Sequence, residues 1–372
     1  MRVALLSPYV WPEVRRGGER YLDDLAWYLR GAGHDVDVIT GTALTPGVTH
    51  TEHGDDVRLS HLRGMARGRV QVTSVETFGP RVVPTLLRRR YDVVHSLNPN
   101  AALAARAVGQ RVVFTLLGYP TPELLASKPV KARVLRGVMR TAGAVTALSE
   151  SVAADVEATL GRRPVVIAPG VRTNAFAPSA RSAVPTILFA SAMRPEKGVD
   201  VLLRAFGAIA ARHSDVRLVL CGPGEPEWAF TSAGDVVAPY RDRVDVVGAG
   251  SPDELPGRYA AAHVTVLPSR NEAFGLVLAE SLASGTPVVG CRGGGADDIV
   301  TDEVGRIVNH GDADALAAAI GDALSLAADP ETAPRCVRRA MTWDWQQAIG
   351  PQHEALYRDV ASTLHRRGRH RT

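Results

Sequence analysis

The sequence predicts an α/β protein built from two doubly wound, Rossmann-like domains that face a central cleft. Short apolar strands alternate with amphipathic helices along the chain, which is typical of parallel sheets covered by helices. The alternation stops at a stretch rich in Pro, Ser and Ala, residues 173–184, and then starts again. A length of 372 residues also exceeds the size at which one hydrophobic core keeps growing, which favours two domains.

The first domain, residues 1–172, consists of strand-then-helix units. Apolar runs predict strands at residues 3–7, 34–40, 91–95, 111–115 and 142–148. Leu22, Leu25 and Leu29 recur on one helical face, which predicts a helix over residues 19–31. An Ala-rich helix is expected between residues 95 and 111, and a helix capped by Ser149 over residues 149–160. Residues 165–170 end the domain.

The second domain, residues 185–344, repeats the pattern after the linker. Strands are predicted at residues 186–190, 216–221, 244–247, 264–267 and 288–290, and an amphipathic helix at residues 199–211. The last helix, residues 345–364, has no strand to return to, so we expect it to pack back on the first domain. A basic tail, residues 365–372, follows it.

Composition limits the kind of protein and its partners. The net charge is +4, the basic residues are nearly all Arg, and Lys occurs only at Lys128, Lys131 and Lys197. We interpret the tail as a solvated segment and expect no nucleic-acid partner, with peripheral contact to an anionic membrane as the alternative. Three scattered cysteines argue against a disulfide framework or a zinc site. With no signal peptide and no apolar run of roughly 18 residues, we expect a cytoplasmic protein, with the inner face of the membrane as an alternative location.

The most informative stretch runs from Asn271 to Val289. It predicts the end of a strand, a polar loop, and a helix that opens near Phe274 and stops at a left-handed Gly285. In open α/β sheets ligands bind at such strand ends, and a helix N-terminus there suits a phosphate. Glu272 and Glu280 would lie roughly 12 Å apart if the whole span were helical, which suits gripping two ends of one ligand. The alternative is that Glu280 is a solvated helix carboxylate and Glu272 a first-turn acid.

Two further loops carry cations beside glycines. Arg194 and Lys197 follow the first strand of the second domain, where they would neutralise a diphosphate, although Lys197 as an ordinary surface residue is the alternative. The corresponding loop of the first domain contains Arg15, Arg16, Gly17 and Gly18, a weak signal for a phosphate cradle.

Other function classes lack their motifs. The chain has no Gly-x-Gly-x-x-Gly after its first strand, no Walker loop and no Gly-x-Ser-x-Gly elbow. Asp35 and Asp37 match Asp-x-Asp but are explained by strand alternation, and Asp312 with Asp314 by a helix cap. We therefore expect no metal site.

These residues resemble the motifs of family-four retaining glycosyltransferases of GT-B fold. The resemblance rests on Asn271-Glu272-Ala273-Phe274-Gly275 with Glu280, on Arg194-Pro195-Glu196-Lys197-Gly198, and on Gly17-Gly18-Glu19-Arg20. Pro169-Gly170-Val171 and Gly293-Gly294-Gly295 extend it over nearly the whole chain.

The resemblance implies a hexosyltransferase-type enzyme that moves a sugar from a nucleotide-diphosphate donor to an acceptor hydroxyl, with no cofactor. It implies that Arg194 and Lys197 bind the diphosphate and stabilise the leaving phosphate together with a helix N-terminus. Glu280 would hold the ribose, Glu272 the transferred sugar, and Gly17 with Gly18 would close over the diphosphate. The other implied donor contacts are Phe274, Gly275, Leu276 and Gly250.

The first domain is expected to hold the acceptor, which can be a sugar, a small polar molecule or a lipid head group. Candidate side chains are Arg15, Arg16, Asn98, Leu117 and Tyr119, with Tyr9, Trp11, Glu13 and Asn100 nearby.

Two positions depart from the family pattern. Leu117 stands where the family commonly has a His near C6 of the donor sugar, which suggests a 6-deoxyhexose donor. The alternatives are a shifted alignment, or a substitute at Tyr119 or His95. Arg172 stands where the family often has Asp. Two alternative functions stay open, a sugar-nucleotide epimerase of GT-B fold and a non-catalytic sugar-nucleotide binding protein.

Overall fold

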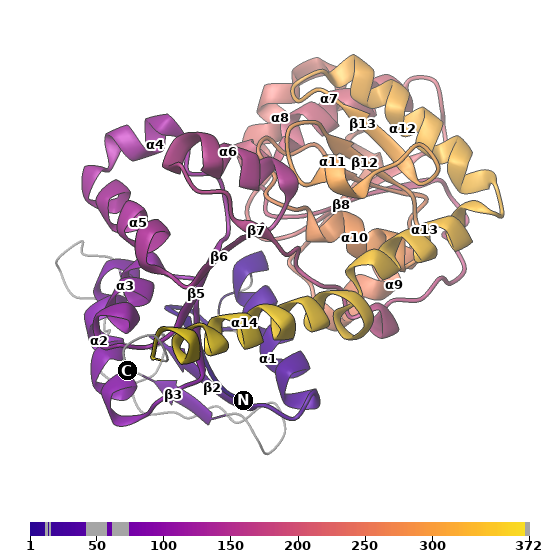
Figure 1. Cartoon of the computed structure of the whole chain (residues 1–372). Coiled ribbons are helices and arrows are strands. Elements are labelled where there is room, and N and C mark those ends of the chain that lie inside the picture. The colour runs from indigo at the N-terminus through magenta and orange to yellow at the C-terminus, as the bar shows by residue number, and fades with distance from the viewer. Residues whose placement is uncertain (12–13, 15, 42–57, 62–73, 369–372) are drawn as a thin grey trace. The chain divides into compact units, whose positions relative to one another are not determined.

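The computed structural model describes residues 1–11, 14, 16–41, 58–61 and 74–368. The sequence predictions for Glu13, Arg15 and the last residues of the basic tail lie outside these residues. The chain divides into two compact units (Figure 1). Unit 1 is formed by Met1–Gly170 together with Trp345–Thr372, and unit 2 by Val171–Asp344.

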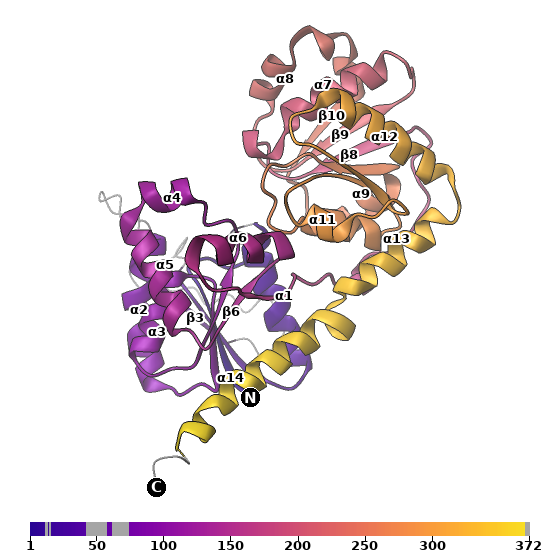
Figure 2. The same ribbon diagram turned by 45° about the horizontal axis from the view of Figure 1, so that its top comes forward.

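Unit 1 contains a seven-stranded parallel sheet in the order β3-β2-β1-β4-β5-β6-β7. Its helices cover both faces, with α2, α3 and α5 side by side on one face and α1 with α14 on the other (Figures 1 and 2). The strands are β1 (Arg2–Ser7), β2 (Asp35–Thr40), β3 (Arg58–His61), β4 (Val93–Ser96), β5 (Val112–Leu116), β6 (Ala144–Ala147) and β7 (Val165–Val166). The helices are α1 (Gly17–Gly31), α2 (Ser74–Arg88), α3 (Pro99–Ala107), α4 (Pro122–Ser127), α5 (Pro129–Thr141), α6 (Glu150–Leu160) and α14 (Gly350–Gly368).

Unit 2 contains a six-stranded parallel sheet in the order β10-β9-β8-β11-β12-β13. The strands are β8 (Thr186–Ala190), β9 (Arg217–Cys221), β10 (Val244–Gly248), β11 (Val264–Leu267), β12 (Val288–Cys291) and β13 (Gly305–Val308). The helices are α7 (Val199–Ala210), α8 (Glu227–Ala233), α9 (Leu255–Ala261), α10 (Leu276–Ala283), α11 (Ala296–Ile299), α12 (Ala313–Ala328) and α13 (Thr332–Ala340). The predicted α/β class with doubly wound parallel sheets is confirmed.

The end of the chain completes the core of unit 1. A π-helical turn, η7 (Trp345–Ile349), leads into α14, which packs against α1 and against the face of β4 and β5. Trp345, His353 and Tyr357 are fully buried there beside Tyr21 and His95. Two close approaches need glycine. A Cβ at Gly170 would lie 2.5 Å from the Trp345 ring, and one at Gly350 would overlap the Tyr28 ring.

Pattern reasoning missed several elements, among them α2, β3 and β13. Helix α2 contains Pro80 and Pro84, residues that normally argue against a helix interior. Strand β13 begins at Gly305, where a side chain would collide with the Val288 carbonyl of the neighbouring strand. Among the described helices, none combines the length and apolar character needed to cross a bilayer.

Candidate functional site

The centre of the sheet in unit 2 brings one cation and one carboxylate together. Strands β8 and β11 are neighbours, and the loops that leave their carboxyl ends carry Lys197 and Glu272. Lys197 Nζ lies 2.6 Å from Glu272 Oε2, and the two side chains are 25% and 19% exposed. This ion pair therefore lies at the edge of the sheet where open α/β folds bind ligands, with part of its surface open to solvent.

The loop after β8 turns sharply to present Lys197. The 3₁₀ turn η2 (Pro195–Lys197) ends at Gly198, whose φ of +70° is left-handed. A Cβ at Gly198 would overlap the Pro268 carbonyl oxygen, so glycine is required for both conformation and space. The Arg194 side chain is 63% exposed and lies 3.7 Å from Glu196. Arg194 is thus exposed to solvent beside Glu196, whereas Lys197 is held by Glu272.

The loop after β11 is fixed on both sides. The Arg270 N–H donates to the Glu196 carbonyl at 2.9 Å, which joins it to the loop after β8. On the other side, the Gly295 N–H donates to the Glu272 carbonyl at 2.8 Å. Side chains at Gly294 or Gly295 would overlap the backbone of Glu272 or Phe274. The glycine run after β12 is therefore needed for close packing against this loop.

Helix α10 begins later than the sequence suggested. Gly275 takes a left-handed φ of +92° as the N-cap, so the first helical residue is Leu276 and not Phe274. Phe274 is buried and packs edge-on against Trp343, with ring centroids 5.9 Å apart. The predicted left-handed Gly285 is confirmed, with φ of +77°. Gly275 leaves the first backbone N–H groups of α10 at the same sheet edge as Lys197.

The two carboxylates have different environments. Glu280 is 2% exposed, and its Oε2 accepts a hydrogen bond from the Tyr259 hydroxyl at 2.9 Å. The alternative of a solvated Glu280 is therefore wrong, because α10 turns this side chain toward buried Tyr259. The alternative of Glu272 as a first-turn acid is also wrong, because the helix begins four residues after it. The 12 Å estimate does not apply, since the span is only partly helical.

Gly250 follows edge strand β10 at the same end of the sheet. Its φ is +57°, and a Cβ there would lie 3.2 Å from Glu254 Oε2. Glu254 in turn pairs with Arg258 at 2.8 Å.

In unit 1, the Gly17-Gly18 pair opens α1 after β1. A Cβ at Gly18 would lie 2.7 Å from Leu117 Cδ1, so the glycine loop and the loop after β5 are in contact. Leu117 is 37% exposed. Arg16 is the exposed N-cap of α1, and its guanidinium lies 5.5 Å from the centroid of the Tyr9 ring.

Other first-domain candidates have local partners. The Asn98 side chain is buried and caps α3 by accepting a hydrogen bond from the Ala101 N–H at 3.0 Å. The hydroxyls of Tyr119 and Ser151 are 2.9 Å apart. His95 lies in the core, where its ring nitrogens bond to the hydroxyls of Tyr357 and Thr115, both at 2.6 Å. Burial holds the pKa of His95 well below its ordinary value. His95 is therefore not placed to replace the family His.

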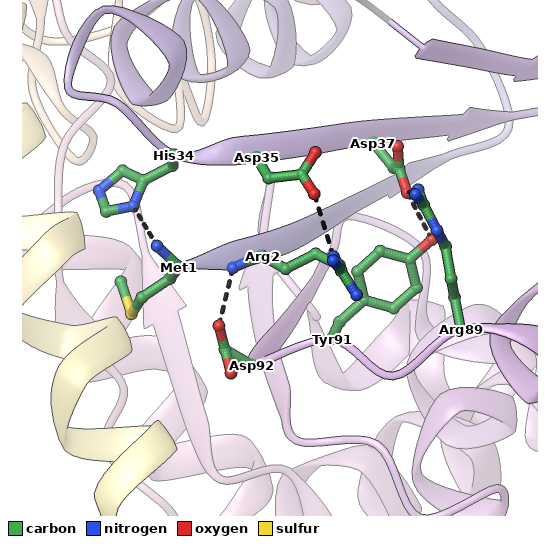
Figure 3. Close-up of polar contacts among 8 residues, drawn as sticks. All are labelled: Met1, Arg2, His34, Asp35, Asp37, Arg89, Tyr91 and Asp92. Carbon is green, nitrogen blue, oxygen red and sulfur yellow. Dashed lines mark hydrogen bonds and ion pairs between the residues drawn. The ribbon is translucent and has the colours of Figure 1, made fainter.

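The first Asp-x-Asp pair has a structural role (Figure 3). Asp35 pairs with Arg2 at 3.0 Å, and Asp37 pairs with Arg89 and accepts from the Tyr91 hydroxyl at 2.8 Å. These contacts lie toward the amino ends of β1 and β2, away from the ligand edge. In the second pair Asp312 caps α12, as predicted, by accepting from the Ala315 N–H. Within the described residues, no group of three His, Cys, Asp or Glu side chains is arranged to hold a metal ion.

Both halves of the chain match models of known protein families. The model of the family "Glycosyl transferases group 1" matches residues 171–343, and that of "Glycosyltransferase Family 4" matches residues 15–175. A GDP-mannose-dependent alpha-(1-6)-phosphatidylinositol monomannoside mannosyltransferase of Mycolicibacterium smegmatis is 32% identical over 66% of this chain and 69% of its own. The chain belongs to the group 1 glycosyltransferases.

Two further relatives extend over most of this glycosyltransferase. A D-inositol 3-phosphate glycosyltransferase of Acidothermus cellulolyticus is 29% identical and aligns with 94% of this chain and 88% of its own. Among solved structures, sucrose-phosphate synthase from Thermosynechococcus elongatus superposes with a TM-score of 0.82, at 24% identity, over 96% of this chain and 98% of its own. This likeness shows the GT-B fold.

Sequence reasoning missed two residues that support the site of this glycosyltransferase. Tyr259, on α9, is the hydroxyl partner of Glu280, and His310, after β13, donates to the Pro268 carbonyl. Neither residue belongs to a local motif. Tyr259 reaches from α9 to Glu280 on α10, and His310 reaches from the loop after β13 to the loop after β11.

Proposed function

We propose that this glycosyltransferase moves a sugar from a nucleoside-diphosphate donor to an acceptor hydroxyl, with retention of anomeric configuration and without a metal ion. The observation that supports this most directly is the convergence of Lys197, Glu272 and the N-terminus of α10 at one sheet edge. A cation, a carboxylate and free N–H groups suit a ligand that has both phosphates and hydroxyls.

The proposed catalytic work is electrostatic. As the nucleoside diphosphate departs, negative charge grows on its terminal phosphate. Lys197 would bind this phosphate as a fixed point charge, and Arg194, which is exposed, would close on it with its fork of N–H donors. The first N–H groups of α10 would add dipolar stabilisation. Such preorganised charges lower the barrier without a divalent ion.

The two carboxylates would hold the two ends of the donor. Glu280 is buried and oriented by Tyr259, which suits paired hydrogen bonds to ribose hydroxyls. Glu272, beside Lys197, would accept hydrogen bonds from the transferred sugar, together with the backbone of Phe274, Gly275 and Leu276. Separate carboxylates thereby position the sugar against its leaving group.

The test is a panel of UDP- and GDP-sugars incubated with the full chain, with and without candidate acceptors and with and without EDTA. We expect acceptor-dependent release of one nucleoside diphosphate, unchanged by EDTA, and a product whose anomeric proton signal by NMR matches the configuration of the donor. Conversion of one sugar nucleotide into its epimer would support the epimerase alternative. Binding without release would support the non-catalytic alternative.

Among the possible acceptor classes, specific observations favour a lipid head group. Several relatives carry phosphatidylinositol in their names.

In unit 1, the segment of α4 and α5 has five cations and one carboxylate, Glu123. Its cations are exposed, and the described carboxylates form no ion pair with them. They are Lys128, Lys131, Arg133, Arg136 and Arg140, and Val130 beside them is 73% exposed. Arg133, Arg136 and Arg140 share one helical face.

This surface of α5 would attract the protein to anionic lipid, at about 1 kcal/mol for each cation. The test is flotation with phosphatidylglycerol–phosphatidylcholine vesicles. The double variant Arg136→Gln/Arg140→Gln should lose about tenfold or more in binding, while Arg88→Gln/Arg90→Gln, with the same charge change at the end of α2, should bind like the natural chain. A chain ending before His365 separates the contribution of the tail. Equal binding by all four proteins would refute the lipid contact.

A further inference from the structure

A histidine outside the family motifs donates a hydrogen bond to a buried backbone carbonyl beside the proposed binding site of the sugar donor. His310 Nδ1 lies 3.1 Å from the carbonyl oxygen of Pro268. Pro268 is buried, and the described residues provide no other hydrogen bond to this oxygen. Because a carbonyl only accepts, Nδ1 must carry the hydrogen. Buried carbonyls need a donor, so this histidine satisfies a group that would otherwise be left without one.

His310 itself is firmly placed. It follows β13 and reaches past the end of β12 to the end of β11, spanning three neighbouring strands at the ligand edge. The next residue, Gly311, turns the chain with φ of +88°, and Asp312 then caps α12. The backbone of His310 therefore leads directly into a capped helix.

Pro268 is the first residue of the loop after β11, and this loop contains a residue in a strained backbone conformation. Gly198 packs directly on the Pro268 carbonyl, just behind Lys197. Three residues later, Asn271 has φ of +55°, the one left-handed non-glycine among the described residues, and Glu272 follows. A residue in such a conformation persists when its surroundings over-determine it. A shift of Pro268 would thus move both sides of the Lys197–Glu272 pair.

We infer that His310 is a positioning residue of the donor site. It holds the Pro268 carbonyl, and through it the loop that carries Glu272 and the turn that carries Lys197. The inference rests on the proposed donor site.

The test compares His310→Phe, which keeps a ring but has no donor, with His310→Asn, which keeps an N–H at about the position of Nδ1. His263→Phe is the matched control. His263 is half-buried at the opposite end of β11, and its Nδ1 accepts from the Thr186 N–H at 3.2 Å. Readouts are kcat and donor KM from nucleoside-diphosphate release, the pH profile of kcat, and the thermal unfolding midpoint.

We expect His310→Phe to lose about tenfold to a hundredfold in kcat/KM, because the reacting groups are displaced. His310→Asn should recover most of this loss and keep the shape of the pH profile, and His263→Phe should keep the natural kcat/KM even where its unfolding midpoint falls. Three results would overturn the inference: full activity of His310→Phe, no rescue by His310→Asn, or equal loss in His263→Phe. If the natural chain releases no nucleoside diphosphate from any donor, the proposed function fails instead. In that case the thermal unfolding midpoint still tests the contact between His310 and Pro268. A midpoint that falls in His310→Phe and is not restored in His310→Asn would refute the positioning role.

Discussion

Lys197 and Glu272 lie 75 residues apart in the chain, yet their charged atoms are 2.6 Å apart at the carboxyl ends of two neighbouring strands. Lys197→Ala should lower kcat/KM about a hundredfold or more, because the proposed contact between its positive charge and the leaving phosphate is lost. The measurement is initial-rate kinetics of nucleoside-diphosphate release. Arg212→Ala, an exposed cation at the end of α7, is the control and should keep the natural rate. Unchanged turnover in Lys197→Ala would refute the proposed role.

The Tyr259–Glu280 bond leads to a prediction about nucleotide affinity. Glu280→Gln should weaken binding of the nucleoside diphosphate about tenfold, because the proposed charge-assisted hydrogen bonds to the ribose would be replaced by neutral ones. Tyr259→Phe should weaken it less, since it removes only the group that orients the carboxylate. Isothermal titration with the product nucleotide checks both. If Tyr259→Phe were the more damaging change, Glu280 would not be the ribose ligand.

Leu117, against which Gly18 packs, bears on the choice of sugar. From the family resemblance we predict that Leu117 forms an apolar wall near C6 of the donor sugar. Such a wall should favour a 6-deoxyhexose donor, and Leu117→His should shift the preference toward the corresponding hexose. The measurement is the ratio of kcat/KM for the two donors. Leu87→His, at an exposed leucine on α2, should leave that ratio unchanged. The same ratio in the natural chain and in Leu117→His would rule the idea out.

The buried histidines predict how stability depends on pH. Burial lowers the pKa of His353 from 6.5 to about 3, and that of His95 well below 6.5. Between pH 6.5 and the lowered values, the unfolded chain binds protons that the folded chain does not. Stability should therefore fall with decreasing pH in this window, by about 1.4 kcal/mol per pH unit for each histidine. Urea unfolding from pH 7 to pH 5 measures the slope.

Replacing one of these histidines provides the control for that slope. His353→Gln should reduce the pH dependence by the contribution of one proton. His213→Gln, at an exposed position, should leave it unchanged. A slope that is equal in all three proteins would contradict the assignment.

Two glycines in helices predict opposite effects on stability. Gly350→Ala should destabilise the protein by more than about 2 kcal/mol, because the new methyl group at buried Gly350 would overlap the Tyr28 ring. Gly321→Ala in α12 has open space and should stabilise it by about 0.5–1 kcal/mol. Thermal or urea unfolding distinguishes the two. A stabilising Gly350→Ala would mean that Tyr28 can move away at little cost.

The sequence predicted most central strands, because these are short apolar runs bounded by turns. It did not predict α2, whose two prolines oppose a helix that packing nevertheless imposes. It also did not predict β13, a short strand that begins with Gly305.

At the site, motifs drew attention to Lys197, Glu272 and Glu280, but their surroundings depend on distant partners. The burial of Glu280 depends on a tyrosine 21 residues earlier, and the support of the Pro268 carbonyl on a histidine 42 residues later. No local pattern encodes either contact, because both form only when the sheet is assembled.

The discontinuous make-up of unit 1 has a consequence for its synthesis. Val171–Asp344 is one uninterrupted segment, so all of its residues are made before Trp345. Met1–Gly170 emerges earlier, yet the side chains that close its interior, among them Trp345 and Tyr357, are translated after the whole of unit 2. The interior of unit 1 can therefore close only after unit 2 has been made, and we expect its unfinished apolar surface to stay exposed during that time.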